Sequence, residues 1–149
     1  MRLHRHANRM LSVLAIVAVW GTRSAAGATL TVTDPGDNAT PGQLRAAINA
    51  AAPGDTITFS LAPGTTITLD ATIGPLLISR DLTISGPGPS NLFISGGGNT
   101  PVFDIHNPPY PPPPSPPVQI TVNISGVTIE NSLGVGVLNE PAIFTLQLV

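Results

Sequence analysis

The strongest indication of the fold lies in the stretch Asp55–Ile94, DTITFSLAPGTTITLDATIGPLLISRDLTISGPGPSNLFI. Within it, apolar residues alternate with hydroxyl residues over short runs, a pattern that is typical of half-buried β-strands. Glycine, proline, serine and asparagine separate the runs, and these residues favour turns. An offset of 25 residues relates four apolar doublets: Ile57/Phe59 to Leu82/Ile84, and Ile67/Leu69 to Leu92/Ile94. The stretch therefore predicts strands that recur at a fixed interval.

A fixed interval of this size indicates a solenoid, and several strands in each repeat indicate a parallel β-helix. Further doublets follow, and the first is related to the last by an offset of 24: Val122/Ile124, Val127/Ile129 and Leu146/Leu148. The chain has no Asn-Gly or Asp-Gly pair, the strongest signals for a hairpin. We therefore predict an all-β solenoid of about four coils. A β-sandwich is the alternative.

One helix is predicted ahead of the repeats. It follows a strand at Thr29–Thr33 and a turn at Asp34–Asp37. Thr40 suits an N-cap, Pro41 suits the first helical position, and Gln43 completes a capping box. Four apolar residues then share one helical face: Leu44, Ala47, Ile48 and Ala51. We predict a helix from Pro41 to Ala52 that covers the apolar end of the first coil.

Residues 1–28 have the order of a secretory signal peptide. Arginines come first, the apolar run Met10–Trp20 follows, and small residues end at Ala26-Gly27-Ala28. The apolar run is too short to span a bilayer, which needs roughly 20 residues. We expect a secreted or cell-surface protein, with an uncleaved N-terminal anchor as the alternative.

The composition excludes several classes of function. The 149 residues include no cysteine and no lysine, and only 9% are charged. Beyond residue 28, two arginines face eight acids, a net formal charge of −6. A disulfide scaffold, a zinc site, a coiled coil and a nucleic-acid binder are therefore not expected.

The N-terminal residues carry a resemblance to a known family. The run Gly42–Ile48, GQLRAAI, followed by Asp55–Phe59, DTITF, resembles the start of exported bacterial pectin-lyase-like proteins with a CSLREA-type motif, related to polymorphic outer-membrane protein passengers. Gly42 stands where that motif has cysteine, and Ala46 where it has glutamate. The resemblance implies a right-handed parallel β-helix. It extends over Asp81–Ile105, Val122–Asn131 and Gly134–Leu148, with Asn139 expected at a turn. Family members continue further, so we expect a fragment of a longer protein.

The acidic residues do not form a recognisable catalytic set. A glycosidase needs two carboxyl groups about 5–9.5 Å apart, and a calcium-dependent lyase needs several convergent carboxylates. At the 25-residue offset, however, each acid is aligned with a residue that is not an acid: Asp55 with Arg80, Asp70 with Ser95, and Asp104 with Ile129. We predict an Asp55–Arg80 ion pair between coils. We predict no catalytic, cofactor-binding or metal-binding residue.

Three other features suit structural roles. Asp104 and His106 lie two residues apart on one strand face and are expected to form a surface pair. Asp34 and Asp37 are assigned to a turn. Residues 107–117, NPPYPPPPSPP, are expected to form a stiff polyproline II insertion between coils, with a docking site at Tyr110 as the alternative.

These predictions divide the chain into a signal peptide (1–28), an N-terminal strand and capping helix (29–54), and β-helix coils (55–149). The expected function is a non-catalytic scaffold that binds carbohydrate or other cell-surface components. The alternative is the N-terminal fragment of a polysaccharide lyase or glycoside hydrolase. Membrane attachment is expected only through an uncleaved signal or a missing C-terminal anchor, and self-association through an open sheet edge.

Overall fold

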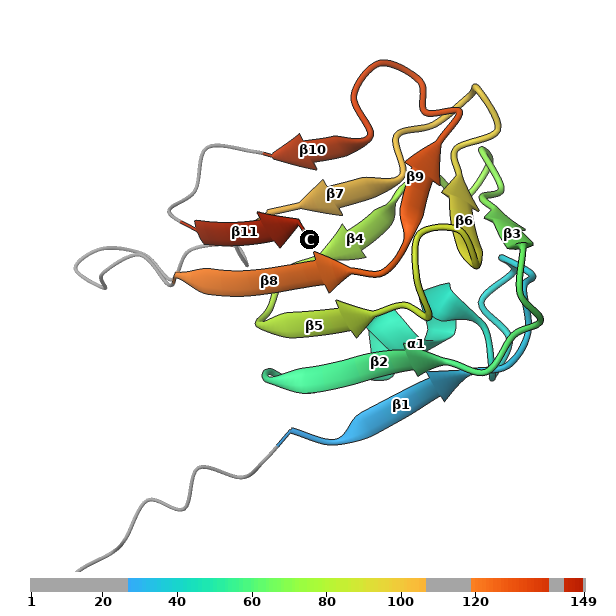
Figure 1. The fold of residues 1–149 in the computed structure, drawn as a ribbon. Helices are drawn as coiled ribbons and strands as arrows, with labels where there is room; N and C mark the ends of the chain where they lie inside the picture. The colour runs from blue at the N-terminus through green and yellow to red at the C-terminus, as the bar shows by residue number, and fades with distance from the viewer. Residues whose placement is uncertain (1–26, 107–118, 140–143, 149) are drawn as a thin grey trace, which may run out of the picture.

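A computed structural model describes residues 27–106, 119–139 and 144–148 (Figure 1). The Pro-rich insertion (107–117) and all but the last two residues of the predicted signal peptide lie outside these ranges. The described residues form one α-helix and eleven β-strands, which confirms an all-β protein with a single short helix. The elements are β1 (Thr29–Val32), α1 (Leu44–Ala50), β2 (Asp55–Phe59), β3 (Thr65–Thr68), β4 (Leu76–Ile78), β5 (Leu82–Ser85), β6 (Leu92–Ser95), β7 (Phe103–Ile105), β8 (Ile120–Ser125), β9 (Thr128–Glu130), β10 (Val137–Asn139) and β11 (Phe144–Leu148).

The strands belong to three sheets, and all eight described strand pairs are parallel. Sheet A has the order β1-β2-β5-β8-β11, sheet B has β3-β6-β9, and sheet C has β10-β7-β4. The chain visits the sheets in a constant order. From β2 to β10, each successive group of three strands contributes one strand to A, one to B and one to C (Figure 1).

The first repeat has the same length in all three sheets. Ile57 lies opposite Ile84 in sheet A, Ile67 opposite Ile94 in sheet B, and Leu76 opposite Phe103 in sheet C. Each offset is 27 residues, so the expected 25 is wrong by two. A slip of two residues keeps every side chain on the same face of its strand, so apolar alternation cannot distinguish the two registers. The offset of 24 between Val122 and Leu146 is confirmed.

Aliphatic side chains from all three sheets fill the interior. The inward residues of neighbouring strands stack on one another, as Ile57, Ile84 and Ile124 do in sheet A, and each is at most 1% exposed. Phe103 of β7 is the largest fully buried side chain among the residues whose burial the structure describes. Burying one such side chain contributes roughly 1.5–3 kcal/mol, so these stacks are the main stabilising feature of the fold.

Sheet C was not predicted as a separate set of strands. Its members β4, β7 and β10 have three residues each, too short for alternation to stand out. β4 also reads Leu76-Leu77-Ile78, an unbroken apolar run in which Leu77 is 53% exposed. Asn139, expected at a turn, ends strand β10 instead.

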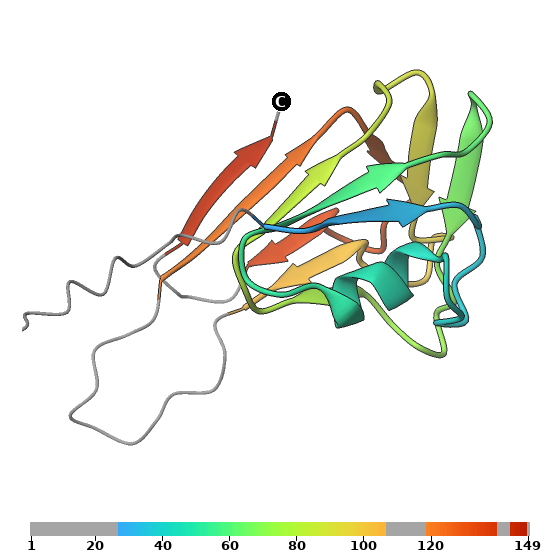
Figure 2. The same ribbon diagram turned by 90° about the horizontal axis from the view of Figure 1, so that it is seen from below.

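Helix α1 begins later than predicted. Gly42 has a φ of +94°, which no right-handed helix accommodates, so the helix starts at Leu44 rather than Pro41. Half of the expected capping box forms, because the Gln43 side chain accepts a hydrogen bond from the Thr40 backbone N–H. Leu44, Ile48 and Ala51 are buried as predicted, and Ala47 is partly buried. The helix packs against β1 and β4, which are edge strands of sheets A and C (Figure 2).

Candidate functional site

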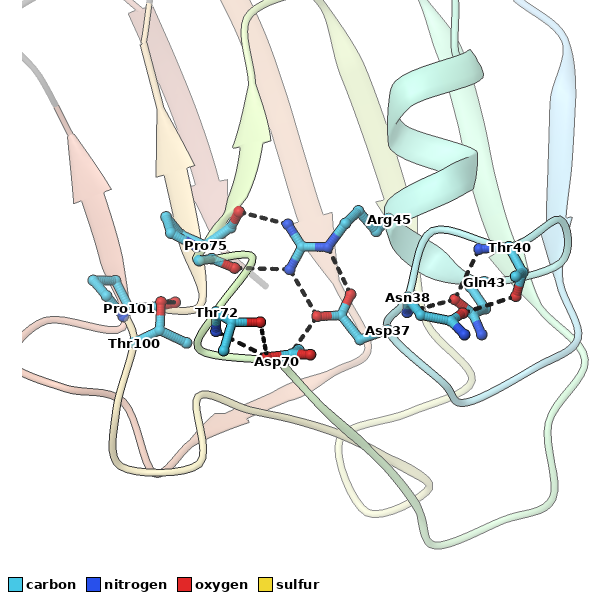
Figure 3. A network of polar contacts seen from close by, with 11 residues as sticks. Asp37, Asn38, Thr40, Gln43, Arg45, Asp70, Thr72, Pro75, Thr100 and Pro101 are labelled. Atoms are coloured by element: carbon cyan, nitrogen blue, oxygen red, sulfur yellow. Dashed lines mark hydrogen bonds and ion pairs between the residues drawn. The ribbon is translucent and has the colours of Figure 1, made fainter.

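The most extensive polar cluster in the described part of the chain is centred on Arg45 and Asp37, beneath α1 (Figure 3). Arg45 lies in the first turn of the helix, and Asp37 lies in the loop that precedes it. Arg45 Nε donates to Asp37 Oδ1 at 2.8 Å, and Nη2 donates to Oδ2 at 2.7 Å. The two side chains are only 8% and 3% exposed. This two-bond geometry is the strong form of a carboxylate–guanidinium pair.

The same guanidinium connects the helix to the loop before β4. Its Nη1 donates to the Pro75 carbonyl at 2.8 Å, and Nη2 donates to the Gly74 carbonyl at 2.7 Å. Asp37 Oδ2 also accepts a hydrogen bond from the Asp70 backbone N–H at 2.8 Å. Each charged group is therefore occupied by protein partners. The cluster holds the loop before α1 and the loop before β4 together and leaves neither group directed at a substrate.

Asp70 belongs to the rim of this cluster. Its carboxylate accepts hydrogen bonds from the Thr72 hydroxyl at 2.7 Å and the Thr72 backbone N–H at 2.8 Å. The hydroxyl, then the backbone N–H, and to a smaller extent the charge of Arg45, hold the pKa of Asp70 below its ordinary value of 3.8. The expected alignment with Ser95 is wrong, because Ser95 lies opposite Thr68.

The predicted Asp55–Arg80 ion pair is also wrong. The register places Asp55 opposite Leu82. Its carboxylate accepts hydrogen bonds from the backbone N–H groups of Ala28 and Ala52, each at 2.7 Å, and Arg80 donates to the Ala51 carbonyl. Asp55 therefore fixes the chain on both sides of α1 rather than pairing between coils.

Asp104 and His106 lie side by side on the outer side of β7. Asp104 Oδ1 is 3.6 Å from His106 Nδ1 and has no hydrogen-bond partner. In sheet C, Asp104 lies between Leu77 and Leu138, so its expected alignment with Ile129 is wrong. The described residues contain no group of three histidine, cysteine or acidic side chains that could hold a metal ion.

An open groove of about 410 Å³ lies between α1 and β1. Leu30, Pro41 and alanines of the helix line it, and none of its lining residues is titratable. The groove therefore offers apolar contact and no acid–base chemistry. No helix in the described ranges is long and apolar enough to cross a bilayer.

The outer face of sheet A carries two rows of uncharged polar side chains, which we call the hydroxyl face. Strand alternation turns these residues outward, opposite the aliphatic stacks of the core. Successive strands keep the rows in register, and Thr31 Oγ1 lies 3.3 Å from Thr58 Oγ1. The sequence signal is the Thr-x-Thr or Thr-x-Ser pattern of β1, β2 and β5, which by itself indicates only strand alternation. The rows are Thr29, Thr56, Thr83 and Asn123, and Thr31, Thr58, Ser85 and Ser125.

Comparison of the chain with protein-family models, curated proteins and solved structures finds no match.

Proposed function

We propose that this chain is an exported, non-catalytic scaffold built as a right-handed parallel β-helix of about four coils. The observation that carries the proposal is the constant first repeat. Strands β2, β3 and β4, one from each sheet, are each followed 27 residues later by a parallel neighbour in the same sheet. Equal repeats around three faces are what a solenoid requires, because each coil stacks on the one before it.

The position of the helix supports a capping role. α1 contacts the edge strands of two sheets, and Leu44 and Ile48 extend into the aliphatic core. An apolar end covered in this way is protected from association with other chains. Self-association is therefore expected only through sheet edges that the helix does not cover.

The use of the charged residues supports a scaffold rather than an enzyme. Arg45, Asp37 and Asp55 are buried and hydrogen-bonded to the loops they connect. A lyase or glycosidase needs free carboxyl groups that converge on one point of the substrate. A buried charge without a partner costs free energy, and each of these three charged groups has its partners within the chain. The three residues therefore act by holding the loops in place.

The partners we propose are carbohydrates or other components of a cell surface. The signal-like segment 1–28 supports secretion or surface display, and the formal charge of −6 beyond it disfavours nucleic acid. The outer faces of sheets B and C are surfaces that such a scaffold presents to carbohydrate.

The test is to incubate the full chain with a panel of polysaccharides, with and without Ca²⁺. Unsaturated products and new reducing ends are then measured. We expect neither. Product formation that is lost in Asp104→Asn would overturn the scaffold proposal and favour the lyase or hydrolase alternative. Thr66→Asn, an exposed change on sheet B, is the matched control.

A further inference from the structure

The hydroxyl face repeats in two directions with a single register. Along each strand, its residues are two positions apart, as Thr56 and Thr58 are in β2. Across the sheet, the next strand carries the equivalent residues Thr83 and Ser85. Parallel strands are about 4.8 Å apart, and two residues of a parallel strand advance about 6.6 Å. The face is therefore a lattice of oxygen-bearing side chains with a cell of about 4.8 by 6.6 Å.

We propose that the hydroxyl face binds the surface of ice. In ice every water oxygen has tetrahedral neighbours at about 2.75 Å, the normal O–H···O distance. That geometry places second-neighbour oxygens about 4.5 Å apart and gives a repeat of about 7.3 Å along the axis of the stacked layers. Both spacings agree with the protein lattice to within about a tenth.

The chemistry of the face agrees with a neutral partner. The two rows contain threonine, serine and one asparagine, and no charged residue. Water in a crystal carries no net charge, so an uncharged face is complementary to it, whereas a charged side chain would hold a hydration shell of its own. Threonine also presents a methyl group beside each hydroxyl, and the stiffness of its χ1 torsion keeps the two groups in place.

The same features disfavour a sugar ligand at this position. Sites for individual small molecules are concave and are lined mainly by apolar and aromatic side chains. The hydroxyl face is the outer side of a sheet, and its two rows hold no aromatic ring. A crystal surface such as that of ice has its own two-dimensional repeat, so it contacts all positions of both rows at once. This inference needs only the register of sheet A and goes beyond the scaffold proposal.

The experiment compares the full chain with two tyrosine variants in three assays: partition into a growing ice hemisphere, ice-crystal shape, and thermal hysteresis. Thr58→Tyr places a bulky ring in the middle of one row. Thr66→Tyr is the matched control, because Thr66 is exposed on β3 in sheet B. Circular dichroism and the thermal midpoint establish that each variant is folded. Thr83→Tyr, in the other row, replaces Thr58→Tyr if that variant does not fold.

We expect the unmodified chain to enter ice, to shape crystals and to produce hysteresis. These properties should be lost in Thr58→Tyr or Thr83→Tyr and kept in Thr66→Tyr. Exclusion of the unmodified chain from ice would overturn the proposal, as would equal activity in the folded row variants. Retention on crystalline chitin or cellulose, without ice binding and with the same sensitivity to Thr58→Tyr, would assign the face to a polysaccharide instead. Failure to bind ice would not affect the scaffold proposal, because that proposal is tested separately by the incubation with polysaccharides.

Discussion

Arg45 donates two hydrogen bonds, of 2.8 and 2.7 Å, to the carboxylate of Asp37, which lies eight residues earlier in the chain, and both side chains are buried. The remaining bonds of the guanidinium go to the carbonyls of Gly74 and Pro75. One side chain of α1 therefore fixes the loop before the helix and the loop before β4. This arrangement orients the helix against the edges of sheets A and C.

Replacing Asp37 with alanine should destabilise the fold strongly. The change leaves the guanidinium of Arg45 buried without its counter-ion, and breaking a buried pair in this way costs about 3–5 kcal/mol. The measurement is the free energy of unfolding from urea denaturation of the full chain.

The control for this prediction is Asp104→Ala. Asp104 and His106 are 23% and 32% exposed and are 3.6 Å apart, so the loss should be at most about 1 kcal/mol. Equal losses in Asp37→Ala and Asp104→Ala would contradict the role given to the buried cluster.

Ile84→Ala tests the stacked interior. Ile84 is fully buried in sheet A between Ile57 and Ile124. Removing its side chain leaves a cavity that rigid neighbouring strands cannot close, and the expected loss is about 2–5 kcal/mol. Leu77→Ala, at a side chain that is 53% exposed, should change stability by no more than about 0.5 kcal/mol. Similar losses for the two variants would show that Ile84 is not in a closed core.

The hydrogen bonds to Asp70 predict a pH dependence. Because its pKa is lower in the folded chain than the ordinary 3.8, the ionised carboxylate stabilises the fold above pH 3.8. That contribution is lost as the pH falls through the lower folded value. Thr72→Val removes the hydroxyl donor, so its urea midpoint should differ from that of the unmodified chain more at about pH 7 than at about pH 2. An equal difference at both pH values would contradict the assignment, and Thr66→Val serves as the control.

The strands of sheets A and B were predictable because their alternation is clear. Thr29-Leu30-Thr31-Val32 and Leu82-Thr83-Ile84-Ser85 place apolar residues inward and hydroxyl residues outward, as the structure has them. β4 could not be recognised in the same way, because Leu77 is apolar and faces outward. Alternation is clear in β5, whose outer residues are polar, and absent in β4, whose outer residue is apolar.

The cluster around Arg45 could not be predicted from the sequence. Position 45 lies beside Leu44 in a short helix, and nothing in the local pattern indicates that its guanidinium is buried. Its partners come from two loops, and the Pro75 carbonyl is 30 residues away along the chain. Asp37 was assigned to a turn on local grounds, and its second role as a counter-ion depends on how that turn packs under the helix. Contacts of this kind follow from the tertiary fold rather than from a motif.

Both proposals depend on the register of the strands, and paired cysteines can test that register because the chain has no cysteine of its own. Thr58→Cys with Ser85→Cys joins residues that lie opposite each other, with Cα atoms about 4.8 Å apart, which a disulfide can bridge. Thr58→Cys with Thr83→Cys represents the 25-residue offset. In the observed register that pair lies on a diagonal of about 8 Å, which exceeds the reach of a disulfide.

The measurement is the number of free thiols in each double variant after mild oxidation of the folded, monomeric chain. We expect the Thr58/Ser85 variant to lose both thiols and the Thr58/Thr83 variant to keep both. A disulfide in the Thr58/Thr83 variant, or free thiols in the Thr58/Ser85 variant, would contradict the parallel register on which the fold and both proposals depend.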